Sequence, residues 1–209
     1  MTYYVGVDVG GTSVKIGVVS SAGSIVSEMA IVTGAERPQE VVFLDILEGV
    51  RQVVAASGLG WEKVRAVGVG CPGMVRSEEG MVLYNNNLGW RDFLLGPMLT
   101  EALTLPARVE NDANAAALGE VVAGCAMGTS SAMIITLGTG IGSGFVIDGR
   151  IWAGYNSAAC EFGHMVIVHG GRPCTCGRRG CFEAYASATG LIAMTNEAIA
   201  ADPKGPMAE

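Results

Sequence analysis

The stretch YYVGVDVGGTSVKIGVV, Tyr3–Val19, joins two runs of β-forming residues through a short turn at Gly10, Gly11 and Thr12. A further glycine turn leads into a third run of the same kind over residues 24–32. Apolar runs rich in β-branched residues and separated by glycine turns are typical of strands joined in hairpins. The stretch therefore predicts a three-stranded antiparallel meander.

Helices and further strands are expected after this meander. Between Pro38 and Gly58, apolar residues fall at helical spacing, which predicts a helix that covers one face of the sheet. The other expected elements are a strand at Val64–Gly70, a short helix over Arg91–Leu103, a strand at Ala107–Glu110 and an Ala-rich helix from Asn111.

The segment Ser130–Trp152 repeats the pattern of the first stretch, with strand, Gly-rich turn, strand, Asp-Gly turn and strand. Two such units with helices between them predict an α/β protein of two lobes that face each other across a cleft. We place the first lobe at residues 1–120 and the second at residues 121–209.

Composition excludes several classes of function. The chain has 209 residues, half of them hydrophobic, and 13 Lys and Arg against 20 Asp and Glu give a net charge of −7. Such a charge offers no basic surface for a nucleic acid. The N-terminus has neither a basic flank nor a continuous apolar run, so we expect no signal peptide, no membrane partner and a cytoplasmic location.

The turn in DVGGTSVK has the chemistry of a phosphate site. Gly10 and Gly11 let backbone N–H groups approach an anion closely, and Thr12 adds a hydroxyl donor. Asp8 stands where a carboxylate can hold Mg²⁺ directly or through water, and Lys15 can offset phosphate charge. Taken alone, the octapeptide fits a plain glycine hairpin slightly better than a phosphate site.

The second turn, LGTGIGSG, repeats this chemistry at Gly138, Thr139 and Gly140. Two such turns on facing lobes can donate hydrogen bonds to the phosphates of a nucleotide from both sides. Neither turn is a Walker loop, because no Gly-Lys-Ser or Gly-Lys-Thr follows the glycines, and strand-to-strand turns do not suit a Rossmann fingerprint.

Asn111 and Asp112 directly precede the Ala-rich helix in VENDANAAALGE. Either residue can serve as an N-cap, which is the simplest interpretation of one of them. One cap needs only one such residue, so the pair indicates a second role. A carboxylate at a helix N-terminus is kept ionised by the dipole, which suits a base that accepts a proton from an alcohol.

Three of the six cysteines, Cys174, Cys176 and Cys181, lie close together in CTCGRRGC. Their spacing fits three thiolate ligands of a tetrahedral Zn²⁺, which needs a fourth ligand. The chain has two histidines, and we favour His164 over His169. Four protein ligands leave no open position for water, so the site is expected to be structural. The alternative is a set of reduced cysteines tolerated in a loop.

The motifs DVGGTSVK, ENDANAAALGE, LGTGIGSG, EFGH and CTCGRRGCFEAYAS occur in the order found in the ROK (repressor, open reading frame, kinase) family of sugar kinases. The chain resembles that family over nearly its whole length, and glucokinases most of all. The resemblance implies an actin-like, ribonuclease H-like two-lobed fold, ATP, Mg²⁺ and structural Zn²⁺ as cofactors, a homo-oligomer, and phosphorylation of glucose to glucose 6-phosphate.

The resemblance also implies roles for individual residues, with Asp112 as the catalytic base. The sugar-binding set is Asn111, Asp112, Glu161, His164 and Glu183, bordered by Gly73, Asn86 and Asn87. The nucleotide set is Asp8, Gly10, Gly11, Thr12, Lys15, Gly138, Thr139 and Gly140. The zinc ligands are His164, Cys174, Cys176 and Cys181.

Alternatives to glucose phosphorylation stay open. Kinases for fructose, mannose, N-acetylmannosamine and N-acetylglucosamine share these motifs, and polyphosphate is a less favoured alternative to ATP as donor. A non-catalytic sugar sensor also fits the binding residues. A repressor with an N-terminal helix-turn-helix fits less well, because the first phosphate turn begins at Asp8.

The chain departs from the family pattern at three points. Cys160 precedes Glu161 where many members carry a small residue, usually glycine, and Ser143 stands where a glycine is common. The chain also ends at residue 209, whereas family members continue through much of the second lobe. We therefore expect a fragment with an incomplete second lobe.

Overall fold

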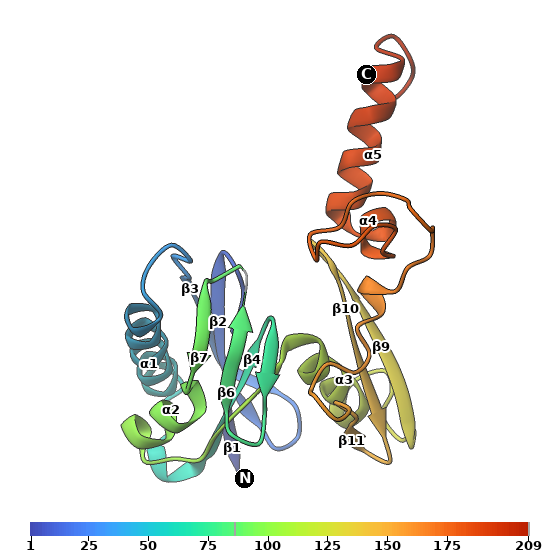
Figure 1. Ribbon diagram of the computed structural model, residues 1–209. Helices are drawn as coiled ribbons and strands as arrows, with labels where there is room; N and C mark the ends of the chain where they lie inside the picture. Colours follow the sequence, from blue (N-terminus) through green and yellow to red (C-terminus); the bar gives the residue numbers. More distant parts are fainter. Residues whose placement is uncertain (86, 209) are drawn as a thin grey trace.

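A five-stranded mixed sheet forms the centre of the first lobe in the computed structural model, which describes residues 1–85 and 87–208 (Figure 1). The predicted meander is present as three antiparallel strands, and two further strands run parallel to the first. In spatial order the strands are β3 (Ile25–Val32), β2 (Ser13–Ser20), β1 (Tyr3–Val9), β4 (Val64–Cys71) and β8 (Ala107–Asn111).

Alternation along β1 decides which face of this sheet is buried. Val5, Val7 and Val9 are buried, whereas the residues between them are exposed on the opposite face. Helix α1 (Gln39–Ala56) packs on the meander, as predicted, and buries a stripe of apolar side chains. The other face of β1, which includes Asp8, is thereby left free for a ligand.

A second, three-stranded sheet was not predicted. It consists of β5 (Met74–Arg76), β6 (Met81–Asn85) and β7 (Trp90–Phe93). The expected helix over Arg91–Leu103 is therefore wrong in its first residues, because β7 pairs with β6, and the helix α2 spans only Leu95–Leu103. Pro97 lies in the first turn of α2, where its missing N–H has no intrahelical partner to lose.

Helix α3 (Asp112–Ala123) connects the first lobe to the strands of the second, β9 (Ser131–Leu137), β10 (Ile141–Ile147) and β11 (Arg150–Ile151) (Figure 1). It packs mainly on β9 and β10. A Cβ atom on Gly144 would lie 2.6 Å from the Ala113 carbonyl oxygen, so glycine permits this close approach. The predicted lobe boundary after residue 120 stays a prediction.

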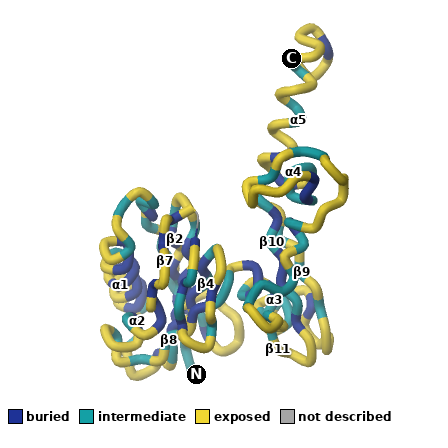
Figure 2. Tube along the Cα trace, viewed as in Figure 1, coloured by how far each residue is buried: buried dark blue, intermediate teal, exposed yellow. Residues whose placement is uncertain are grey.

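A long loop follows β11 and carries the cysteine cluster. The 3₁₀ helix η2 (Phe162–His164) lies within it, and α4 (Glu183–Ala186) and α5 (Ala188–Ala201) follow it. Burial is concentrated in the first lobe, whereas α5 extends away from the three sheets with mostly exposed residues (Figure 2). None of the helices within the described residues combines the length and apolar character that crossing a bilayer requires.

Candidate active site and metal centre

Thr33, a residue that the sequence analysis did not single out, fixes the first glycine turn by hydrogen bonds. The Gly10 N–H donates to the Ser13 carbonyl at 3.0 Å, and the buried Thr33 hydroxyl donates to the Gly10 carbonyl at 2.7 Å. The Thr33 N–H donates to the Thr12 carbonyl at 3.0 Å. The turn is thus fixed before any ligand binds, and no atom lies within 4 Å of the Cβ position at Gly11.

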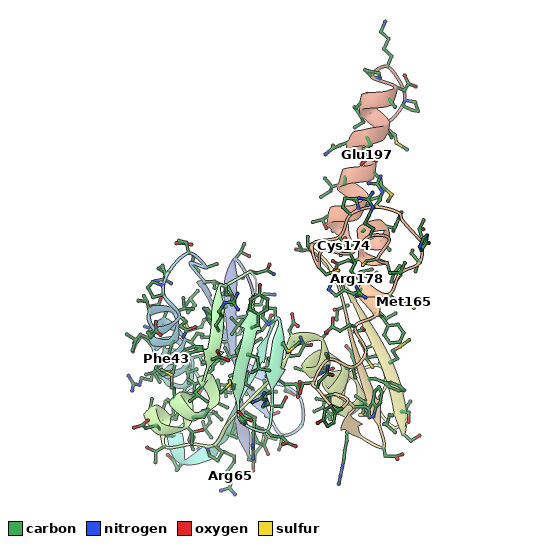
Figure 3. The ribbon with its side chains drawn as sticks, in the orientation of Figure 1. Phe43, Arg65, Met165, Cys174, Arg178 and Glu197 are labelled. Atoms are coloured by element: carbon green, nitrogen blue, oxygen red, sulfur yellow. The ribbon has the colours of Figure 1, made fainter. Side chains whose placement is uncertain are left out.

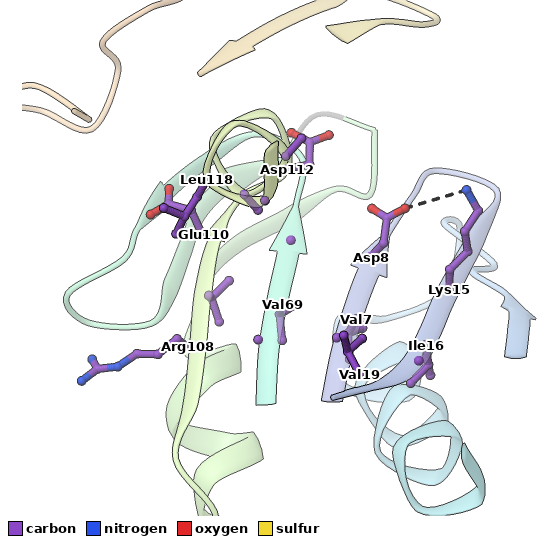
Figure 4. Close-up of a pocket in the computed structure, with 18 of the residues that line it drawn as sticks. Val7, Asp8, Lys15, Ile16, Val19, Val69, Arg108, Glu110, Asp112 and Leu118 are labelled. Atoms are coloured by element: carbon purple, nitrogen blue, oxygen red, sulfur yellow. Dashed lines mark ion pairs between the residues drawn. The ribbon is translucent and has the colours of Figure 1, made fainter. Parts of the chain in front are cut away.

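Asp8 and Lys15 lie opposite each other in the β1–β2 register, one residue pair away from this turn. The Lys15 Nζ atom is 3.9 Å from Asp8 Oδ2, and the two side chains are 71% and 59% exposed (Figure 4). An exposed pair of this kind contributes little to stability. Both groups are therefore available to a ligand beside the turn that joins β1 and β2.

The junction of β8 and α3 separates the roles of Asn111 and Asp112. Asn111 Oδ1 accepts hydrogen bonds from the Ala113 and Asn114 N–H groups at 3.0 and 3.1 Å, so Asn111 is the N-cap. Its Nδ2 donates to the Gly73 carbonyl at 3.0 Å. The Asp112 carboxylate is not needed as the cap and lies at the same edge of the sheet as Asp8 (Figure 4).

The surroundings of Asp112 favour a carboxylate that can take up a proton. Its residue is exposed by accessible surface, yet neighbouring protein atoms partly desolvate the carboxylate, and this desolvation raises the pKa of Asp112. A hydrogen bond from the Ala113 N–H at 2.9 Å opposes the shift, and the negative charge of Asp8 adds to it. The net direction is upward, towards the range of a general base.

The loop around Gly73 is shaped by Asn85, which the sequence analysis also missed. Gly73 has φ +96°, and a Cβ atom there would lie 2.4 Å from the Tyr84 carbonyl oxygen. The buried Asn85 donates from Nδ2 to the Pro72 carbonyl at 2.7 Å and accepts from the Asn87 N–H at 2.9 Å. Asn87 is exposed, and Asn86 lies outside the described residues.

Glu110 is a third residue near the site that has no local sequence signal. Its Oε1 accepts from the Asn111 N–H at 2.9 Å and from Asn114 Nδ2 at 3.0 Å, and its Oε2 accepts from the Ser77 hydroxyl at 2.7 Å. Glu110 therefore fixes the start of α3 against the turn between β5 and β6.

The four predicted zinc ligands lie together. One ligand atom from each of His164, Cys174, Cys176 and Cys181 lies within 4.8 Å of all the others. The Cys176 and Cys181 sulfurs are 3.7 Å apart, and Cys174 Sγ is 3.6 Å from His164 Nδ1. A tetrahedral zinc with bonds of about 2.3 Å to sulfur and 2.0 Å to nitrogen gives edges of roughly 3.5–3.8 Å. The donor set fits that ion.

The cysteines of the cluster differ in pKa. Cys174 and Arg178 lie in the loop beside α4 (Figure 3). Burial acts to raise the pKa of Cys176, but hydrogen bonds from Arg178 and the neighbouring cysteines outweigh it and lower the pKa to about 6. Burial, aided by a hydrogen bond to Glu183, raises the pKa of Cys174 to about 12. Arg178 thus favours a thiolate, the form that binds metal.

Glu183 joins the cysteine cluster to the second glycine turn. Its Oε1 lies 3.1 Å from Cys174 Sγ and 3.6 Å from His164 Nδ1, and its Oε2 accepts from the Ile141 N–H at 3.4 Å. A Cβ atom on Gly140 would lie 2.8 Å from Oε2. One carboxylate therefore contacts both the metal-binding loop and the turn.

The start of α5 also fixes this turn. The Ala188 N–H donates to the Gly138 carbonyl at 3.0 Å, and the Thr189 hydroxyl donates to the Thr139 carbonyl at 2.6 Å. The Gly138 N–H donates within the turn to the Gly140 carbonyl at 3.0 Å. The turn is thus built on the segment that directly follows the cysteines.

Glu161 brings a further carboxylate to the region. Burial raises the pKa of Glu161, the charge of His164 lowers it, and the charges of Asp112 and Glu183 raise it further. These interactions indicate that carboxylates from both lobes share one electrostatic environment. An alcohol-rich ligand with several hydroxyl donors suits such a group of acceptors.

A hollow of about 1330 Å³ opens beside this region (Figure 4). Asp8, Lys15 and Asp112 line one end, and the rest runs along the glycine-rich face of the first sheet and α3. Glu161 and Gly138 are not among its described lining residues. The hollow therefore meets the candidate site at one end only, and the site is better defined by its polar groups.

The chain is similar to known proteins over nearly its whole length. The sequence profile of the ROK family matches residues 4–205. The chain belongs to the ROK family. This ROK chain is 39% identical over 198 residues to a glucokinase of Halalkalibacterium halodurans, covering 94% of the chain and 60% of that protein. It is also 31% identical over 192 residues to the xylose repressor of Bacillus subtilis, covering 91% and 49% respectively.

A solved structure shows the same fold. The ROK family glucokinase from Streptomyces griseus, in complex with glucose and AMPPNP, matches with a TM-score of 0.83 at 37% identity. The match covers 97% of this chain and 62% of that one. It confirms the predicted actin-like two-lobed α/β fold, and the chain spans about 60% of the length of the glucokinase relatives.

Proposed function

We propose that this ROK protein is a hexose kinase that transfers the γ-phosphoryl group of ATP to the 6-hydroxyl of glucose. The observation that carries the proposal is the position of the Asp112 carboxylate at the same end of the strands as Asp8 (Figure 4). Asn111 already caps α3, so the Asp112 carboxylate is not needed for that role. The sugar hydroxyl gives its proton to Asp112, its oxygen attacks the γ-phosphorus, and ADP leaves. Similarity to glucokinases and the glucose complex of a relative support glucose as acceptor.

ATP is proposed to bind between the two glycine turns. The preformed turn at Gly10 and Gly11 offers the Gly11 N–H and the Thr12 hydroxyl to phosphate oxygens, because the Gly10 N–H already donates to Ser13. In the other lobe the Gly138 N–H donates within its turn, which leaves the N–H groups of Thr139 and Gly140 as donors. The AMPPNP complex of a relative supports the nucleotide. Asp8 would hold Mg²⁺, whose preference for oxygen ligands its exposed carboxylate fits, and Lys15 would offset phosphate charge.

The sugar is proposed to contact Asn111, Asp112, Glu161, His164 and Glu183, near Gly73, Asn86 and Asn87. His164 directs Nδ1 towards Cys174, which leaves Nε2 for a sugar hydroxyl. Zn²⁺ would be held by His164, Cys174, Cys176 and Cys181, whose spacing fits a tetrahedral ion. When bound, it supplies structural order to the loop between η2 and α4 and takes no part in proton transfer.

A sugar-binding regulator is the second candidate, because the chain is also similar to a xylose repressor. The two candidates differ in turnover. A coupled assay of ADP release by the complete protein tests the proposal. The sugars to compare are glucose, fructose, mannose, N-acetylmannosamine, N-acetylglucosamine and xylose. Sugar-dependent ADP release with glucose preferred supports a glucokinase, whereas sugar binding by calorimetry without ADP release supports a regulator.

Replacing Gly11 by Val is expected to weaken nucleotide binding at least tenfold. Gly11 has no left-handed φ and open space at its Cβ position, so the backbone accepts Val and the added side chain occupies the phosphate site. Titration calorimetry with AMPPNP and Mg²⁺ measures the effect. Gly119→Val, also at an exposed glycine with open space, is the control. Unchanged AMPPNP affinity in Gly11→Val would show that the turn does not bind phosphate.

Assembly and location rest on the family resemblance. We propose a homo-oligomer in the cytoplasm, with small-molecule sugar and nucleotide as its ligands. Light scattering coupled to size-exclusion chromatography of the complete protein gives the oligomeric state.

A further inference from the structure

The two residues at which this chain departs from the family's glycines, Ser143 and Cys160, lie in direct contact. Cys160 has φ +64°, a left-handed conformation that glycine adopts freely and that a residue with a Cβ atom adopts at a cost. The Ser143 hydroxyl donates a hydrogen bond to the Cys160 carbonyl. The strained residue is therefore held by the second substituted position.

Strand geometry explains why Ser143 faces this segment. Gly142 and Gly144 face α3, where a Cβ atom would lie within 2.9 and 2.6 Å respectively of Ala113 atoms. Side chains alternate along a strand, so Ser143 points to the other face of β10, where it is only 8% exposed. Its Oγ also accepts from the Phe162 N–H at 3.1 Å. One hydroxyl thus binds the backbone on both sides of Glu161.

Glu161 depends on this backbone for its position. Its carboxylate takes part in no hydrogen bond or ion pair with the described residues, so no side-chain partner fixes it. The following residues are docked on the same strand, because a Cβ atom on Gly163 would lie 2.1 Å from the Ile141 carbonyl oxygen. The His164 N–H donates to the Glu161 carbonyl at 3.0 Å. Moving the backbone at residues 160–162 would therefore move the Glu161 carboxylate.

We propose that Ser143 is a positioning residue for the sugar site: its hydroxyl holds the left-handed Cys160 and the Phe162 N–H, and so directs Glu161 towards the sugar. The inference rests on the proposed sugar kinase function. A glycine at position 160 adopts the conformation without help, whereas Cys160 needs the clamp. The two departures from the family pattern compensate each other.

Ser143→Ala in the complete protein tests this role. The expected result is at least a tenfold rise in KM for the sugar, with kcat and the KM for ATP changed less than about threefold. Ser143→Thr keeps the hydroxyl and should stay near the wild type. The double variant Ser143→Ala with Cys160→Gly should recover part of the sugar affinity, because glycine favours the required φ. Ser131→Ala, at an exposed serine on β9, is the control.

Hydrogen exchange gives a readout that does not depend on activity. The Phe162 amide should exchange faster in Ser143→Ala than in the wild type or Ser143→Thr, because one of its two acceptors is lost and only the Cys160 carbonyl, 2.8 Å away, remains. Unchanged sugar KM with unchanged exchange would overturn the proposal, and so would an equal loss of sugar and ATP affinity with a lower Tm. A wild type that phosphorylates no sugar would refute the kinase function, and the exchange result would still decide whether the clamp exists.

Discussion

Replacing Asp112 by Asn is expected to lower kcat for hexose phosphorylation about 10²- to 10⁴-fold, the usual contribution of a general base. The amide keeps the size of the side chain and can still accept the Ala113 N–H, but it cannot take the proton of the sugar hydroxyl. Asn111 remains the N-cap, so α3 should stay intact. Sugar affinity, measured by calorimetry, is therefore expected to change little while ADP release is nearly lost.

Two controls separate proton transfer from general damage. Asp92→Asn changes an exposed aspartate of the first lobe in the same way and should leave kcat unchanged. Asn111→Ala should instead lower stability by about 0.5–2 kcal/mol, because it removes the cap. Near-normal turnover of Asp112→Asn would remove Asp112 from the role of base.

The pH profile of the wild type adds a further check. The base must be deprotonated to act, so activity is lost as the pH falls through the pKa of Asp112. Burial raises that pKa above the ordinary value of an aspartate. The acid limb of kcat/KM should therefore lie at a higher pH than an unperturbed carboxylate would give.

Local periodicity made the first lobe's sheet and its covering helix predictable. The alternation of valines in Tyr3–Val9 and the helical spacing between Pro38 and Gly58 each depend on near neighbours in the sequence. The contiguous motif of Cys174, Cys176 and Cys181 likewise constrained its own geometry. Only His164 had to be chosen among candidates, and it is the histidine that lies in the cluster.

The rest depends on contacts between distant segments. Thr33 reaches the Gly10 carbonyl across the meander, and Ser77 meets Glu110 from a turn 33 residues earlier. The sheet of β5, β6 and β7 has short strands without a long alternating pattern, so helical propensity around Leu95–Leu103 obscured β7. The positive φ of Cys160 has no sequence signal except its departure from a family glycine.

The metal centre gives the second large expected effect. Cys176→Ser should reduce zinc from about one ion per chain to well below that, because a serine hydroxyl is a poor replacement for a thiolate. Loss of a structural metal belongs to the few changes that cost about 3 kcal/mol or more. For a chain of this size, that corresponds to a fall in Tm of roughly 6–12 °C. Elemental analysis and calorimetric melting of protein purified without chelator measure both quantities.

Cys125→Ser is the matched control, because Cys125 is also exposed but lies outside the cluster. Sugar affinity should fall in Cys176→Ser, since the zinc loop orders His164 and Glu183 together.

Nucleotide affinity should fall as well, although by less, because Glu183 and the start of α5 hold the Gly138–Gly140 turn, whereas Thr33 holds the first turn independently. Loss of zinc with normal sugar binding, or well-folded wild type without zinc, would contradict this arrangement. Equal effects of Cys125→Ser would show instead that any exposed cysteine matters, and would leave the cluster with no special role.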